Sequence, residues 1–310
     1  MTEIVDYGAF AGRLRAVMPR WDERPFMPPE VFAAHLADTA PRWELLRAFQ
    51  EEWGFTPPPG PPSWRREDTD EHRLYVRKLR GETLDAADEE DIEGVDVTLP
   101  IPKAADEWWD LPFNSFTHEP RLYWTHPVRP PTVRPDPSGY GVSAGLPDDT
   151  ALADPDGDLR VCVLMAEYQY CNEWGYAASD ATLADPRLLV SDGSDEWWLQ
   201  ADSVTEFYVQ LAAMRLPFAL RPSVEIAELP PDIATRLRAT FPAMGFAAPW
   251  RELNGHTTLY GGPDVILAHD EGEADIALRA AGRTAEALVA AGTALGLDWT
   301  TDIIPPHDRT

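Results

Sequence analysis

Residues 167–216 read EYQYCNEWGYAASDATLADPRLLVSDGSDEWWLQADSVTEFYVQLAAMRL, and they predict a strand-rich sheet followed by a helix. Apolar runs between turn-forming residues predict strands at residues 159–165 and 187–190, and a short aromatic strand at 196–199. Ser203 and Glu206 match the S-x-x-E capping box, and apolar residues then recur at helical spacing. Because this stretch contains no recognisable catalytic grouping, it favours a binding protein over an enzyme.

The same signals predict the elements on either side of this stretch. Upstream we expect a helix at residues 41–53, a proline-rich connector at 56–62, a helix after the prolines of 99–102, a strand at 122–124 and a surface loop at 127–145. Downstream we expect a helix at 231–241, a hairpin at 256–268, a strand at 275–280 and a helix that Thr284 caps and that ends near residue 295.

Runs of strands interleaved with few helices predict an α+β fold, with a mostly antiparallel twisted sheet wrapped by helices. The helical N-terminus and the acidic run at residues 82–96 are expected to form an extension over residues 1–95. The α+β core is then predicted to span residues 96–310.

The chain of 310 residues has a net charge of −27, which argues against binding to nucleic acid or to an anionic membrane. A basic protein partner fits this charge better, although an acidic surface also serves solubility or adaptation to salt. Cys162 and Cys171 are too few for a disulfide framework, so we expect a reduced, cytoplasmic protein. No apolar segment approaches the ~20 residues that span a bilayer.

Cofactor and metal sites are not expected. The glycines of residues 139–145 have the spacing G-x-G-x-x-x-G and follow a proline-rich loop, unlike the dinucleotide-binding fingerprint. His118, Glu119 and His126 are close in sequence but lack the helical H-x-x-x-H spacing of metal ligands. The two histidines of the predicted hairpin are interpreted as structural or surface residues: His256 and His269.

Catalysis by carboxylates is the remaining chemical possibility. A pair such as Glu167 and Glu173 matches the acid and base of a hydrolase, but acids are abundant throughout this chain. Continuous alternation over residues 167–174 would place the aromatic side chains on one face of a half-buried strand, which requires no catalysis. Cys162 has no electropositive setting in the sequence and is expected in the core.

Several ordered motifs carry a resemblance to a known family. They are the entry helix from Leu99-Pro100 to Leu111, the E-x-Q of Glu167 to Gln169, the pair Trp174-Gly175, the segments at residues 185–190 and 203–216, Leu259 to Asp264, Ala281 to Thr284, and Trp299. Their order over about residues 95–300 resembles the SUKH superfamily, in particular its actinobacterial branch. Many bacterial members of that superfamily are immunity proteins.

The resemblance implies a single α+β domain that binds a protein partner, often a secreted nuclease or deaminase toxin, and it carries over no catalytic residues. We therefore predict a non-enzymatic immunity protein that neutralises a basic toxin. The predicted partner contacts are acidic residues and one tryptophan: Glu173, Asp180, Asp185, Asp192, Asp195, Glu196 and Trp198. The alternatives are a cytoplasmic scaffold or regulator of the same fold and a carboxylate-dependent hydrolase.

Overall fold

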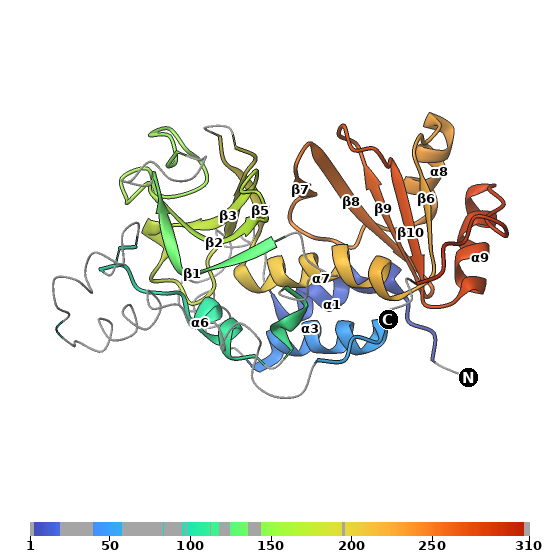
Figure 1. The fold of residues 1–310 in the computed structure, drawn as a ribbon, viewed down its shortest axis with the longest axis horizontal. Coiled ribbons are helices and arrows are strands. Elements are labelled where there is room, and N and C mark those ends of the chain that lie inside the picture. Colours follow the sequence, from blue (N-terminus) through green and yellow to red (C-terminus); the bar gives the residue numbers. More distant parts are fainter. Residues whose placement is uncertain are drawn as a thin grey trace. The chain divides into compact units, whose positions relative to one another are not determined.

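The computed structural model describes residues 3–18, 40–57, 83, 95–96, 98–111, 113–117, 125–135, 144–193 and 196–306. Within these ranges the chain forms six α-helices and two antiparallel sheets of five strands each (Figure 1), which confirms the predicted α+β class. The chain divides into two compact units. Unit 1 comprises Met1–Thr56 and Thr205–Thr310, and unit 2 comprises Pro57–Val204.

The sheet of unit 2 is an antiparallel meander in which each strand pairs with the next along the chain. Its strands are β1 (Thr125–Arg134), β2 (Val161–Glu167), β3 (Glu173–Ala177), β4 (Leu188–Ser191) and β5 (Trp198–Ala201). The strands predicted at residues 159–165, 187–190 and 196–199 are confirmed as β2, β4 and β5, each displaced by one or two residues. Apolar side chains form a core on one face: Leu146, Val161, Val163, Ala177, Leu189 and Trp197.

Strand β1 corrects the prediction of a surface loop at residues 127–145. The prolines of residues 127–131 suggested a loop, yet they lie in a strand at the edge of the sheet. An edge strand tolerates proline because one of its sides needs no backbone N–H donor. The pairing of β1 with β2 shifts register between Pro127 and Thr132, where these prolines lie. The strand predicted at residues 122–124 lies outside the described residues.

The predicted helix after residues 99–102 is confirmed as α6 (Lys103–Asp110), which is followed by the 3₁₀ helix η4 (Asn114–Thr117). Trp108 is fully buried and meets the ring of Phe116 edge to face, with 5.8 Å between the ring centroids. Asn114 donates from Nδ2 to the carbonyl of Trp108 over 2.7 Å, and this bond connects η4 to the last turn of α6. The rings of Trp108 and Phe116 therefore serve packing.

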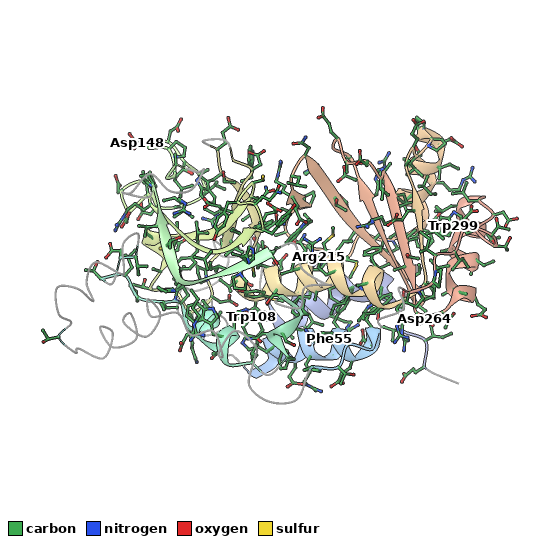
Figure 2. The ribbon with its side chains drawn as sticks, viewed as in Figure 1. Phe55, Trp108, Asp148, Arg215, Asp264 and Trp299 are labelled. Atoms are coloured by element: carbon green, nitrogen blue, oxygen red, sulfur yellow. The ribbon has the colours of Figure 1, made fainter. Side chains whose placement is uncertain are left out.

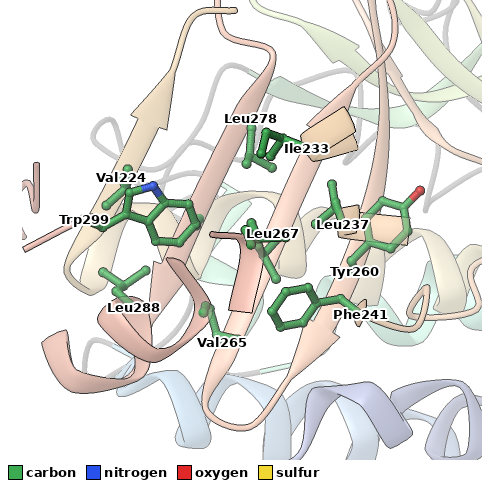
Figure 3. Packing of buried hydrophobic residues seen from close by; sticks show 13 residues of the cluster. Val224, Ile233, Leu237, Phe241, Tyr260, Val265, Leu267, Leu278, Leu288 and Trp299 are labelled. Atoms are coloured by element: carbon green, nitrogen blue, oxygen red, sulfur yellow. The ribbon is translucent and has the colours of Figure 1, made fainter. Parts of the chain in front are cut away.

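The sheet of unit 1 has the spatial order β6-β10-β9-β8-β7. Its strands are β6 (Ser223–Ile226), β7 (Trp250–Glu252), β8 (Gly255–Gly262), β9 (Val265–Asp270) and β10 (Leu278–Gly282). The predicted hairpin is confirmed as β8 and β9, which pair over six positions. The helices α8 (Pro231–Thr240) and α9 (Ala285–Leu295), both predicted, supply Leu237 and Leu288 to the core on this sheet (Figure 3).

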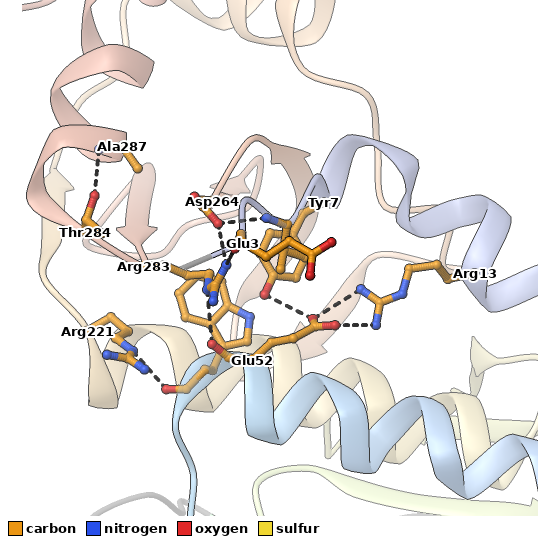
Figure 4. Close-up of polar contacts among 11 residues, drawn as sticks. Glu3, Tyr7, Arg13, Glu52, Arg221, Asp264, Arg283, Thr284 and Ala287 are labelled. Atoms are coloured by element: carbon orange, nitrogen blue, oxygen red, sulfur yellow. Dashed lines mark hydrogen bonds and ion pairs between the residues drawn. The ribbon is translucent and has the colours of Figure 1, made fainter. Parts of the chain in front are cut away.

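The remaining helices of unit 1 are α1 (Phe10–Val17), α3 (Ala40–Trp53) and α7 (Val204–Leu220), and the 3₁₀ helix η1 (Tyr7–Ala9) precedes α1. Polar contacts join the N-terminal helices to the C-terminal part (Figure 4). The carboxylate of Glu52 accepts from Tyr7 and from Arg13, and Arg283 donates to the carbonyl of Glu52 and to Asp264. The N-terminal helices thus belong to the same compact unit as the C-terminal sheet, a division that differs from the expected boundary at residue 95.

Candidate interaction surface

Two of the predicted contact residues lie on the loop that joins β4 to β5. Asp192 and Glu196 are exposed, and Trp198 is partly buried at the start of β5. Trp197 is instead buried and donates from Nε1 to the carbonyl of Ala144 over 2.7 Å. Of the two adjacent tryptophans, Trp197 therefore packs in the core and Trp198 lies at its rim. Asp195 lies outside the described residues.

Two other predicted contact residues are inside unit 2. Glu173 has 0% of its side chain exposed and pairs with Arg134, whose Nε lies 2.9 Å and 3.0 Å from the two carboxylate oxygens. Asp185 is 1% exposed. A partner does not reach these carboxylates in this conformation, because the fold has already enclosed them, which corrects their assignment to a surface contact. Asp180, at the end of the 3₁₀ helix η5 (Ala178–Asp180), is partly buried.

The strand order also separates the predicted residues into two groups. Asp180 and Asp185 lie between β3 and β4, whereas Asp192 and Glu196 lie between β4 and β5. In an antiparallel meander, successive connections lie at opposite ends of the sheet. The four acids therefore do not form one surface, and only the connection from β4 to β5 presents exposed acids from the predicted set.

The turn between β2 and β3 lies at the same end of the sheet as that connection. Continuous strand alternation over residues 167–174 is wrong, because β2 ends at Glu167 and β3 begins at Glu173. Glu167 is 2% exposed, and its Oε2 accepts from the backbone N–H of Gln169 over 2.8 Å and of Cys171 over 3.3 Å. This buried carboxylate fixes the turn, since it satisfies two N–H groups that the strand ladder leaves unpaired.

The turn presents aromatic side chains at the surface. Tyr168 is 41% exposed, and Tyr170, which has a φ of 61°, stacks with His126 at 6.5 Å between ring centroids and 21° between ring planes. His126 is exposed and lies in β1 opposite Ala166, so β1 brings its ring beside the turn. We call His126, Tyr168 and Tyr170 the ring group.

The ring group and the exposed acids are held at one end of the sheet by the backbone. Glu173 pairs with Ser191, and Asn172 donates from its Nδ2 to the carbonyl of Ser191 over 3.2 Å. The turn that carries the ring group is thereby tied to the strand that leads into Asp192. The ring group was not predicted, because residues 168–172 were interpreted as strand; Asn172, a turn-forming residue type, was the available signal of a turn.

Two cavities, one in each unit, have a carboxylate in their lining. A cavity of about 510 Å³ in unit 1 is lined mainly by alanine, glycine and proline, and Asp6 is the one carboxylate in its lining. A cavity of about 560 Å³ in unit 2 contains Asp158 beside Arg160. The hydrogen bond from the Arg160 guanidinium lowers the pKa of Asp158, whereas a general acid requires a raised pKa. Neither lining brings together the acid and base of a hydrolase.

Within the described residues, the cysteines and histidines that the sequence offered as candidates for chemistry lie in the core, in a turn or on strands of the sheets. Burial raises the pKa of the Cys162 thiol to about 12, so it remains a protonated core side chain, as expected. Cys171 is exposed in the turn and not on a strand, and both cysteines are free thiols. His269 is 6% exposed on β9, and His256 is half-buried on β8. His118 and Glu119 lie outside the described residues.

The described ranges contain neither a cluster of metal ligands nor a helix that could cross a membrane. There, no group of three or more His, Cys, Asp or Glu side chains is arranged to hold a metal ion. In the same part of the chain, no helix combines the length and the apolar character that crossing a membrane requires.

Comparison of the chain with protein-family models, with curated proteins and with solved structures finds no match.

Proposed function

We propose that this chain is a non-enzymatic protein-binding protein that takes a basic partner, and that its role is to neutralise a toxin. The observation that carries the proposal is the exposed Tyr168 at the same end of a sheet as the exposed Asp192 and Glu196. Tyrosine is enriched in protein interfaces because it buries a large area at low entropic cost. The role of toxin neutralisation comes from the resemblance to the SUKH superfamily.

Charge supports a basic partner. The net charge is −27, and further exposed acids lie on the segment before β2, where Figure 2 shows Asp148 projecting from the ribbon. Long-range attraction between opposite charges raises the rate of encounter, and it fixes the orientation of approach. A nuclease must be cationic where it grips phosphates, so an anionic inhibitor is suited to that surface. We assign this activity to the cytoplasm.

The experiment is coexpression of this protein with the toxin domain encoded next to it, followed by a growth assay. Survival should be restored by the wild-type protein and reduced by the double variant Asp192→Asn with Glu196→Gln. The matched control is Asp232→Asn, which neutralises an exposed acid on α8 of unit 1. Survival no better than that of cells without this protein would contradict toxin neutralisation.

A pull-down from the native host separates this role from the alternative. Recovery of the secreted effector supports the immunity function, whereas repeated recovery of a housekeeping protein would replace it by a scaffold or regulator of the same fold.

A further inference from the structure

We propose that the ring group of His126, Tyr168 and Tyr170 receives an arginine side chain of the basic partner, with the exposed carboxylates of Asp192 and Glu196 at the same end of the sheet. The inference rests on the proposed function and adds the chemistry of the contact. It starts from the exposed ring of Tyr168 and from the stacked rings of Tyr170 and His126 at 6.5 Å.

The ring group is held in place before any partner arrives. The carboxylate of Glu167 binds two backbone N–H groups of the turn, at 2.8 Å and 3.3 Å, and the N–H of Tyr170 donates to the carbonyl of Glu167 over 2.8 Å. The pairing of Thr125 with Glu167 places His126 at the base of the same turn. A surface that is already ordered loses little conformational entropy on binding, so a single side chain can be recognised there.

The chemistry of this surface selects a cation. The faces of aromatic rings carry negative charge density, which attracts a positive group placed over them. Asp192 and Glu196 are exposed on the connection that lies at the same end of the sheet, and the net charge of −27 repels an anionic ligand.

Arginine fits this arrangement better than lysine. Its planar guanidinium stacks on an aromatic face while its N–H groups remain available in the plane for a carboxylate. The lysine ammonium is a compact and strongly hydrated charge, which cannot stack in this way. The combination of rings and carboxylates at one end of the sheet therefore identifies the partner as a protein with an exposed arginine.

The test uses an oligo-arginine peptide and an oligo-lysine peptide of equal length, each titrated into the full chain by isothermal calorimetry. The wild-type protein should bind the arginine peptide about two- to fivefold more tightly, the ratio that corresponds to an exposed cation–π contact of ~0.5–1 kcal/mol. Tyr168→Ala should abolish this preference, and Tyr168→Phe should keep it because the ring remains. Ile4→Ser, at a side chain in unit 1 that is 69% exposed, is the matched control and should keep the preference.

Three results would overturn the inference: equal affinity for the two peptides, binding of neither peptide, or an arginine preference that survives Tyr168→Ala. Its failure is distinguishable from failure of the proposed function. If wild-type protein and Tyr168→Ala protect cells from the toxin equally well, the function stands and the arginine contact is wrong. If wild-type protein gives no protection, toxin neutralisation fails, and the peptide titration still decides whether the ring group takes arginine.

Discussion

Glu173 was predicted to be a surface contact, but in the folded chain it forms a buried ion pair with Arg134. Both side chains are almost fully buried, at 2% and 0% exposed, and the guanidinium meets both carboxylate oxygens. Removing two charges from water is costly, so each ion is tolerated only because the other is present. Glu173 therefore acts in the interior of unit 2 and not in the recognition of a partner.

We expect Glu173→Gln to lower the free energy of unfolding by ~3–5 kcal/mol, because it leaves the buried guanidinium without its counter-charge. Equilibrium denaturation in urea, followed by circular dichroism, measures this loss. The control Asp192→Asn removes an exposed charge and should change stability by less than ~0.5 kcal/mol. Similar values for the two variants would show that Arg134 does not depend on Glu173.

The lowered pKa of His269 predicts that the stability of the protein depends on pH. Burial lowers the pKa of His269 from its ordinary 6.5, and Arg238 on α8 acts in the same direction, while Glu271 and Asp270 oppose the shift. The Nδ1 of His269 lies 3.7 Å from the carboxylate of Glu271. Because the unfolded chain takes up this proton at higher pH than the folded chain does, acidification favours unfolding.

The stability of the wild-type protein should therefore fall from about pH 7 to pH 5, the range in which an ordinary histidine titrates, and His269→Gln should flatten that fall. Urea denaturation at each pH gives both curves. His256→Gln, at a half-buried position on β8, is the control. Parallel curves for wild type and His269→Gln would contradict the prediction.

Among the elements, α9 is the one whose ends the sequence specified most fully. The Oγ1 of Thr284 accepts from the N–H of Ala287 over 3.2 Å, which confirms the predicted N-cap. Gly296 ends the helix with a φ of 75°, a conformation that glycine adopts without a steric penalty. Helix ends are predictable because the residues that satisfy them are close in sequence.

We expect Thr284→Ala to destabilise unit 1 by ~1 kcal/mol, since it removes the side-chain acceptor at the helix N-terminus. Thr284→Ser keeps a hydroxyl and should cost only a small part of that amount. Thermal denaturation of the three proteins measures the difference. If Thr284→Ser were as destabilising as Thr284→Ala, the methyl group and not the hydrogen bond would be responsible.

For the chain as a whole, the main finding is that residues far apart in sequence share one unit. Tyr7 and Phe10 are fully buried, and their rings contact Phe49, whose helix is bonded to Arg283 through the carbonyl of Glu52. The sequence suggested that the N-terminal residues form an extension. They are instead part of a compact unit that also contains the C-terminal sheet.

Deletion of residues 1–18 should therefore destabilise the C-terminal sheet. We expect faster hydrogen exchange of the backbone amides of β8 and β9, because the deletion removes the bridge between Asp6 and Pro263 and exposes the side chains that Tyr7 and Phe10 cover. Exchange in β2 and β3 of unit 2 is the internal reference and should change little. Digestion of the protein into peptides, followed by mass spectrometry, measures the exchange in both regions. Unchanged exchange in β8 and β9 would contradict the shared core.

The sequence by itself determined the features that depend on near neighbours. The strands around residues 159–199, the helix after Ser203, the hairpin of β8 and β9 and the cap at Thr284 all follow from periodicity, turn residues and capping, which act within a few positions of the chain. The α+β class then follows from the order of these elements. The acidic charge that motivates a basic partner is likewise a property of composition.

Only the tertiary structure decided which of these residues lie at the surface and which are buried. Glu173 is buried against Arg134, which lies 39 positions away in the sequence. Strand β1 forms despite its prolines because it lies at an edge of the sheet. The ring group forms because β1 places His126 beside the turn. Each of these outcomes depends on contacts between distant segments, whose pairing no local pattern specifies. A carboxylate side chain is therefore buried at Glu173 and exposed at Asp192, and the difference lies in the packing around each residue.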